Sequence, residues 1–237
     1  EDTERGEGEI LRPGYWTQRV YGTSERTGDH DQQVFHEALD LIPNLADGKE
    51  PWGLYVGWTG PHDPYVVPER YLDLYDLDDV PLPPSYRDEM ADKPAIYQRM
   101  RQMRFGQLSE REVREAIRHF WAYCTYLDDM FGEILKALEA TGQADNTLVL
   151  YTSDHADYAG DHGLFAKGIP CFQGAYHIPA VIRWPAGVQT PGREVDAFVS
   201  EADFAPTFVE LAGLEVDRDF TGASLMPFLK DTGPETW

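Results

Sequence analysis

The chain has 237 residues, of which 42% are hydrophobic and 13% aromatic, enough to bury the core of one large domain. Its 20 basic and 42 acidic residues give a net charge of −22, which argues against nucleic acid as a partner. The longest apolar runs, at 147–151 and 178–184, are far shorter than the roughly 20 residues that cross a bilayer, so we predict no membrane span.

The first half of the chain predicts a helix, a buried strand and a long loop. Apolar residues at helical spacing predict a helix over 31–42 that ends at Pro43. The apolar and aromatic run 52–58 is typical of a buried strand. Residues 66–104 are rich in proline, tyrosine and aspartate, and they predict a long ordered loop over the surface.

The second half begins with a capping-box pattern. Ser109 followed by Glu112 predicts the start of a long amphipathic helix, which runs to about Ala140. The remaining regular elements are predicted as two strands and a helix, at 147–152, 178–184 and 203–211. Strands that alternate with helices predict an α/β fold with a mainly parallel central sheet flanked by helices. In such folds, sites gather beyond the carboxyl ends of strands.

The first candidate site follows the strand 147–152. Asp154 and His155 would point to opposite faces of a regular strand, so they can share one ligand only after the strand has ended. The predicted boundary falls just before them. A metal site is one interpretation of this pair, and a cap or turn at the strand end is the other.

The second candidate site is the glycine-bearing loop 160–168. Glycine permits backbone conformations that fold closely around an anion. Lys167 is the only lysine between Lys136 and Lys230, so it could supply positive charge to an anionic substrate, although a solvated surface lysine gives the same pattern. For His162, in the same loop, we favour a structural role.

The third candidate site is His62, which follows the strand predicted at 52–58. Pro61 and Pro64 flank the His62-Asp63 pair and restrict the backbone, which could hold the imidazole in place. A fixed histidine can donate a hydrogen bond to an anion or transfer a proton. A histidine in an ordered turn explains the pattern equally well.

Lysine is scarce in this acidic chain. It occurs at only five positions, 49, 93, 136, 167 and 230. This composition is similar to that of proteins from high-salt environments, but an ordinary acidic soluble protein also fits. On the halophilic interpretation, salt screens self-repulsion, and we predict that the thermal unfolding midpoint rises from low to molar potassium chloride. A midpoint that stays flat or falls would count against it.

The chain gives little information about its compartment. No signal peptide is recognisable after Glu1. The two cysteines, Cys124 and Cys171, do not define a disulfide framework. Localisation and oligomeric state therefore stay open.

Several of these motifs, in this order, resemble the type I sulfatases of the alkaline phosphatase superfamily. The resemblance covers most of the chain from about Gln32 onward. It rests on a strand followed by Pro-His-x-Pro, a long helix, a signature that runs from Ser-Asp-His to a lysine, and later segments, at 54–64, 126–138, 152–167, 178–185, 203–207 and 222–227. Ala156 departs from the family's usual glycine, and His177 from a common arginine.

This resemblance implies an alkaline phosphatase/sulfatase-like α/β fold and roles for four residues. Asp154 and His155 would be ligands of a divalent cation, most often Ca²⁺. His62 and Lys167 would bind the sulfate group and act in catalysis at its leaving oxygen. Because Ca²⁺ prefers oxygen ligands and His155 offers nitrogen, Mn²⁺ stays open.

The resemblance also implies parts that this sequence lacks. The family nucleophile is a formylglycine made from the Cys or Ser of a Cys/Ser-x-Pro-x-Arg motif, and neither Cys124 nor Cys171 begins such a motif. We therefore expect residues 1–237 to be a partial sulfatase-like catalytic domain, truncated at both ends. The N-terminal third, with the nucleophile, and the small C-terminal subdomain would be absent.

The implied activity is the hydrolysis of sulfate monoesters, on a sulfated small molecule or carbohydrate. The parent protein would be the enzyme, and the 237-residue chain alone would be inactive. One alternative is a phosphonate monoester or phosphodiester hydrolase of the same superfamily. Another is a non-catalytic module that keeps the fold.

Overall fold

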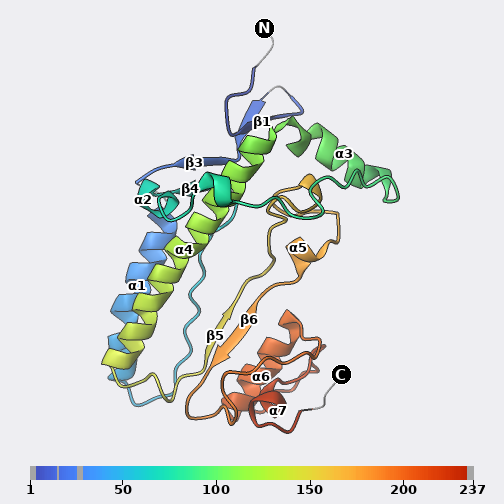
Figure 1. The fold of residues 1–237 in the computed structure, drawn as a ribbon. Coiled ribbons are helices and arrows are strands. Elements are labelled where there is room, and N and C mark those ends of the chain that lie inside the picture. The colour runs from blue at the N-terminus through green and yellow to red at the C-terminus, as the bar shows by residue number, and fades with distance from the viewer. Residues whose placement is uncertain (1–3, 15, 26–28, 234–237) are drawn as a thin grey trace. The chain divides into compact units, whose positions relative to one another are not determined.

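The computed structural model of this chain describes residues 4–14, 16–25 and 29–233 (Figure 1). The chain divides into two compact units. The first comprises Glu1–Asp40, Tyr55–Ile134 and His155–Ile178, and the second comprises Leu41–Leu54, Leu135–Asp154 and Pro179–Trp237. None of the helices in the described part is long and apolar enough to span a membrane.

The strands of the first unit form two small sheets. Strands β1 (Glu9–Arg12) and β2 (Trp16–Arg19) pair as an antiparallel hairpin. Strands β3 (Tyr21–Thr23) and β4 (Tyr65–Val67) pair in parallel. The unit also contains three short helices, which are α2 (Glu69–Leu72), α3 (Ala95–Met103) and α5 (Gln173–Tyr176).

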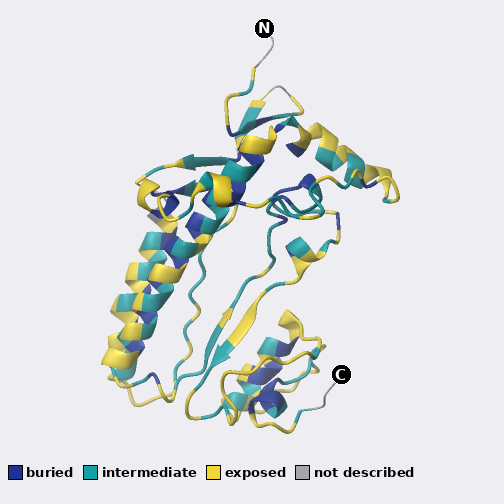
Figure 2. Cartoon of the chain, in the orientation of Figure 1, coloured by how far each residue is buried: buried dark blue, intermediate teal, exposed yellow. Residues whose placement is uncertain are grey.

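Two longer helices continue from the first unit into the second. They are α1 (Asp29–Ala46) and α4 (Glu110–Ala140). The capping box predicted for α4 is present, because Glu112 N donates to Ser109 Oγ at 3.3 Å and Ser109 N donates to Glu112 Oε2 at 2.8 Å. Buried positions recur along α4 (Figure 2), as its amphipathic pattern predicts.

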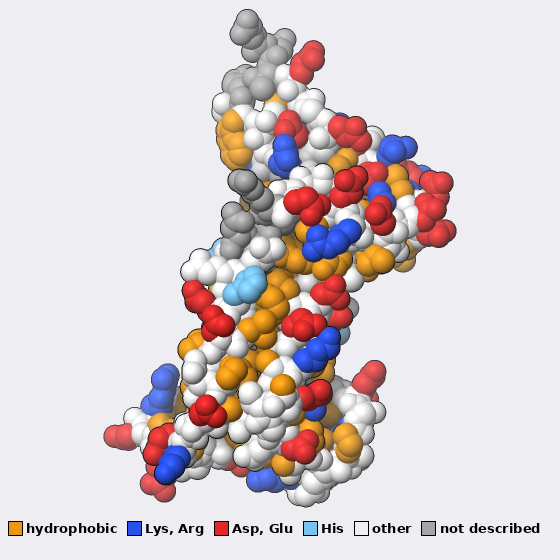
Figure 3. All heavy atoms as spheres, turned by 90° about the vertical axis from the view of Figure 1, so that its left-hand side faces the viewer, with side chains coloured by type: hydrophobic (Ala, Val, Ile, Leu, Met, Phe, Trp, Pro, Cys, Tyr) orange, Lys and Arg blue, Asp and Glu red, His pale blue; other side chains and the backbone are white. Residues whose placement is uncertain are grey.

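The core of the first unit consists of two clusters of buried side chains. One contains Tyr65, Met90, Leu164 and Phe165, none of them more than 1% exposed, and it packs on the first half of α4. The other surrounds Tyr123 and Tyr126 of α4 and includes Val67 of β4. Acidic side chains are scattered among hydrophobic ones on the face seen in Figure 3, and they outnumber the basic side chains, as the net charge leads one to expect.

The second unit contains the antiparallel pair β5 (Val149–Thr152) and β6 (Ala180–Arg183). Helices α6 (Phe204–Leu211) and α7 (Met226–Leu229) follow. The two strands and α6 were predicted within a few residues of these bounds. Gly213, at φ +64°, lies just past the end of α6, in the left-handed conformation that closes helices.

The predicted mix of strands and helices is present, and the described strands form three two-stranded pairs, of which one is parallel. Among the described residues, β3 and β4 form the only parallel pair, and β5 and β6 are antiparallel. Parallel neighbours need a crossover connection, usually a helix. The segment 153–179, which joins β5 to β6, contains only the four-residue helix α5 and a 3-10 turn, and β6 runs back along β5.

Three element predictions were wrong. Residues 52–58 do not form a strand, because they have no strand partner in the described part of the chain, and Tyr55 is 92% exposed. Pro43 lies inside α1, which continues to Ala46. The segment 66–104, predicted as a loop, includes α2 and α3; the amphipathic pattern of α3 was hidden by the prolines around it.

Candidate active site

His62 lies in a loop between Pro61 and Pro64, and local hydrogen bonds orient its ring. The peptide bonds Gly60–Pro61 and Asp63–Pro64 are both cis. The Nδ1 atom of His62 lies 2.7 Å from the main-chain oxygen of Asp63 and 3.2 Å from its Oδ1 atom. These acceptors favour a proton on Nδ1, which assigns the other nitrogen, Nε2, to contacts with other groups.

Lys167 supplies that contact. Its Nζ atom is within hydrogen-bonding distance of His62 Nε2. The ring of His155 is also near, with its centroid 6.3 Å from that of His62. The first unit therefore brings together three of the four predicted site residues, although His62 lies 93 residues before His155 and 105 residues before Lys167 in the sequence.

Asp154, the fourth predicted residue, belongs to the second unit and directly precedes His155. Strand β5 ends at Thr152, so Asp154 and His155 follow its carboxyl end. Asp154 is exposed and His155 is half-buried. The sequence-based requirement that the strand end before this pair is met.

A buried carboxylate anchors the loop that carries His62. Asp31 of α1 is 1% exposed and accepts hydrogen bonds from Thr59 N at 2.7 Å, Gly60 N at 3.0 Å and the Tyr123 hydroxyl at 3.1 Å. A Cβ atom on Gly60 would lie 2.6 Å from the Tyr123 ring, so only glycine fits there. Burial, and then the charge of Asp31, raises the pKa of Tyr123, which keeps this hydroxyl protonated as a donor.

A second carboxylate connects the segments that carry His62 and Lys167. The hydroxyl of Tyr65, three residues after His62, donates to Asp157 Oδ2 at 2.7 Å. Asp157 Oδ1 accepts from Ala159 N at 2.8 Å and from Ala166 N, just before Lys167, at 3.0 Å. Burial raises the pKa of Asp157 to about 6, against the opposing effect of these hydrogen bonds. Asp157 thus shapes the loop from which Lys167 extends.

His162 has the structural surroundings that its sequence position suggested. Its Nδ1 atom lies 2.8 Å from Asp88 Oδ2, and its ring stacks on Phe172 at a centroid distance of 3.7 Å. Its backbone nitrogen donates to Ser85 Oγ at 3.0 Å. These contacts hold the loop 160–168 in place. Among the described residues, the partners of His162 in these contacts are Ser85, Asp88 and Phe172, not His62 or Lys167.

Asp154 and His155 carry a carboxylate and an imidazole, groups of the kinds that bind metal ions. His155 Nδ1 lies 3.0 Å from the main-chain oxygen of Ala156, a contact that typically orients a metal-binding imidazole. No group of three or more His, Cys, Asp or Glu side chains that could hold a metal occurs among residues 4–14, 16–25 and 29–233. Asp154 and His155 could therefore be only part of a ligand set.

Sequence reasoning missed Asp31, Asp157 and Tyr65. Asp157 carried a weak signal, because an aspartate that accepts from the backbone nitrogen two residues later is a common turn. Asp31 and Tyr65 carried none, since their partners are distant in the sequence and only the fold brings them close.

The comparisons with solved structures define the fold class. The phosphonate monoester hydrolase of Agrobacterium radiobacter superposes with a TM-score of 0.75 at 30% sequence identity, over 86% of this chain and 43% of that one. The fold is therefore the α/β fold of the alkaline phosphatase superfamily, and the prediction of an alkaline phosphatase/sulfatase-like fold is confirmed.

The sequence comparisons identify the family. The model named Sulfatase matches residues 7–214, and the chain belongs to the sulfatase family. The multifunctional alkaline phosphatase superfamily protein PehA of Trinickia caryophylli is 32% identical over 221 residues, which cover 87% of this chain and 43% of PehA. The choline-sulfatase of Rhizobium meliloti is 33% identical over 230 residues, which cover 88% of this chain and 42% of that protein. The chain thus spans less than half the length of these relatives.

Proposed function

We propose that the protein containing this chain is a sulfuric ester hydrolase that cleaves sulfate monoesters. The observation that carries the proposal is the contact between Lys167 and His62, two residues from distant parts of the sequence that both lie within the range matched by the Sulfatase model. An ammonium group and an imidazole nitrogen directed at one point can bind an oxyanion. The substrate is a sulfated small molecule or carbohydrate.

Lys167 and His62 have different roles in this proposal. The ammonium group of Lys167 stabilises negative charge that develops on the sulfate ester in the transition state. With protons on both ring nitrogens, His62 binds the sulfate or protonates the leaving oxygen through Nε2, while the contacts of Nδ1–H with Asp63 orient the ring. Both residues thus assist the breaking of the bond between sulfur and the leaving oxygen, while a separate nucleophile attacks the sulfur.

The proposal places the nucleophile outside this chain. It is a formylglycine, formed from a cysteine or serine in a segment that this sequence does not include. Asp154 and His155 contribute two ligands to a divalent cation, Ca²⁺ or alternatively Mn²⁺, which supplies positive charge near the transferred group when bound. The 237-residue chain alone is then inactive.

A phosphonate monoester or phosphodiester hydrolase is the second candidate. It is supported by the structural likeness to the phosphonate monoester hydrolase described above. Phosphonate and phosphodiester substrates also carry negatively charged oxygens on a tetrahedral centre, so Lys167 and His62 would serve them similarly.

An assay of the complete protein separates the two candidates. We expect the product of the full reading frame, expressed so that formylglycine forms, to have its highest kcat/KM on an aryl sulfate when compared with an aryl phosphodiester and an aryl phosphonate. The 237-residue chain should be inactive on all three, because its sequence contains no Cys/Ser-x-Pro-x-Arg motif from which the formylglycine nucleophile could form. Highest activity on the phosphodiester or phosphonate would favour the second candidate, and activity of the 237-residue chain would contradict the assigned chemistry.

Metal binding gives a second test. We expect the 237-residue chain to bind Ca²⁺ weakly, because the described residues provide only Asp154 and His155 where calcium prefers six to eight oxygen ligands. Isothermal titration calorimetry measures this directly, with Asp154→Asn as the matched variant. Tight binding of one Ca²⁺ per chain would show that this ligand set is wrong.

A further inference from the structure

The hairpin of β1 and β2 turns one face toward the candidate active site. Its register pairs Arg12 with Trp16 and Ile10 with Gln18, so these four side chains share a face. Gln18 Nε2 donates to Asp63 Oδ2 at 2.9 Å. The other carboxylate oxygen of Asp63 is 3.2 Å from His62 Nδ1, so this face lies one residue away from the proposed catalytic histidine.

Two polar atoms on this face are buried and have no hydrogen-bond partner among the described residues. Arg12 Nε and Gln18 Oε1 form no hydrogen bond with any described residue. A buried polar group without a partner costs about 1 to 3 kcal/mol, so such groups usually have a water or a ligand as partner. The guanidinium carbon of Arg12 lies 5.8 Å from the ring centre of Trp16, which is 53% exposed. An exposed aromatic ring beside a cation forms a surface open to ligands.

The charges around Arg12 favour an anion. Burial lowers the pKa of Arg12, the positive charge of Arg104 lowers it further, and the charge of Asp63 raises it. The Asp63 carboxylate already contacts Gln18 and His62. The guanidinium groups of Arg12 and Arg104 therefore repel each other. The single negative charge of Asp63, which also contacts Gln18 and His62, offsets their two positive charges only in part. An additional anion would relieve this repulsion.

We propose that Arg12, with Arg104 and Trp16 beside it, is a substrate subsite that binds a second oxyanion, a sulfate or carboxylate, of a molecule whose sulfate ester lies at His62 and Lys167. This subsite rests on the proposed function and gives it a substrate class, the polyanionic sulfate esters. Arg suits the role because its planar group binds oxyanions through two parallel hydrogen bonds.

Non-hydrolysable sulfonates test the subsite in the complete protein. We expect at least one alkane disulfonate, in a series from ethane to hexane at constant ionic strength, to bind about tenfold more tightly than methanesulfonate by calorimetry. In Arg12→Ala and in Arg104→Ala, the ratio of disulfonate to methanesulfonate affinity should fall to the statistical factor of about two. Arg12→Lys keeps the charge without the planar fork and should lower the ratio in part.

Arg19→Ala is the matched control, because Arg19 is an exposed arginine of the same hairpin and should leave the ratio unchanged. The subsite is overturned if no disulfonate exceeds the statistical factor, or if the ratio persists in both Arg12→Ala and Arg104→Ala. A different result would contradict the proposed function, namely that Lys167→Ala and His62→Ala leave the affinity for methanesulfonate unchanged. A ratio that still depends on Arg12 in that case would support an anion site independent of sulfatase chemistry.

Discussion

Replacing Lys167 by alanine should lower kcat/KM for sulfate ester hydrolysis by the complete protein by about 10²- to 10³-fold. Lys167 is the cation in contact with His62, so we expect it to stabilise the negative charge that develops in the transition state. Removing one such preorganised hydrogen-bond donor lowers the rate by about 10²- to 10³-fold in other enzymes. Steady-state kinetics on an aryl sulfate measure the effect. Lys167→Arg should retain part of the activity, because the charge remains although its position changes.

Two further variants make the result specific. His62→Ala should also lower kcat/KM, by about 10²- to 10⁴-fold if the ring transfers a proton to the leaving oxygen. That loss should be smaller for substrates whose leaving group is already a weak base. Lys49→Ala, at an exposed lysine, should leave the kinetics unchanged. Near wild-type kcat/KM in Lys167→Ala would remove this residue from the proposed mechanism.

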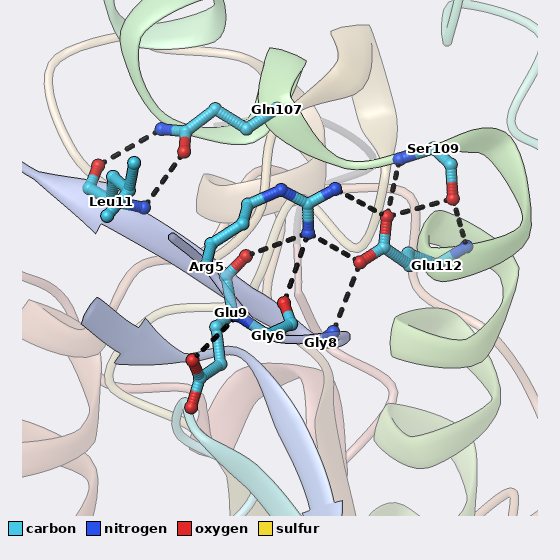
Figure 4. Close-up of polar contacts among 8 residues, drawn as sticks. All are labelled: Arg5, Gly6, Gly8, Glu9, Leu11, Gln107, Ser109 and Glu112. Carbon is cyan, nitrogen blue, oxygen red and sulfur yellow. Dashed lines mark hydrogen bonds and ion pairs between the residues drawn. The ribbon is translucent and has the colours of Figure 1, made fainter. Parts of the chain in front are cut away.

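Replacing Glu112 by alanine should lower the free energy of unfolding by about 3 kcal/mol. Glu112 is 6% exposed and holds the segment before β1 against the start of α4 (Figure 4). Its carboxylate accepts from both terminal nitrogens of Arg5, at 2.6 and 2.9 Å, and from Gly8 N at 3.1 Å. It also accepts from the nitrogen and the hydroxyl of Ser109, each at 2.8 Å. Alanine would leave the buried Gly8 N and the partly buried donors of Arg5 and Ser109 without this partner.

The same network predicts a pH dependence. The hydrogen bonds from Arg5, ahead of the opposing effect of burial, lower the pKa of Glu112 from 4.5 to about 2. A carboxyl group whose pKa is lower in the folded state stabilises the fold above its unfolded pKa, and this stabilisation is lost as the pH falls through the folded pKa. Stability should therefore fall between about pH 4.5 and pH 2, and Glu112→Gln should lack this component.

Urea unfolding monitored by circular dichroism measures both effects, provided that the m-value is unchanged. Glu110→Ala is the matched control, because Glu110 lies in the same helical turn and pairs with Arg87 and Arg114 at the exposed surface. Its loss should cost no more than about 1 kcal/mol. Equal costs for Glu110→Ala and Glu112→Ala would show that the buried network adds no stability.

Local patterns in the sequence determined the helices α1, α4 and α6 and the positions of the candidate residues in the chain. The capping box of Ser109 and Glu112 placed the start of α4, because it depends only on residues within one helical turn. The apolar runs placed β5 and β6, and the strand end before Asp154 and His155 followed from them. The motif order was enough to indicate the family, which the match over residues 7–214 confirms.

The tertiary structure decided which of these residues meet and what supports them. Strand direction could not be predicted from the sequence, because pairing depends on the path of the connection, and residues 153–179 between β5 and β6 are enough for either direction. The contact of Lys167 with His62 joins positions 105 residues apart. Asp31 holds the His62 loop by main-chain hydrogen bonds, which leave no pattern in the residues they hold. Long-range contacts of this kind depend on chain folding, so only the three-dimensional structure reveals them.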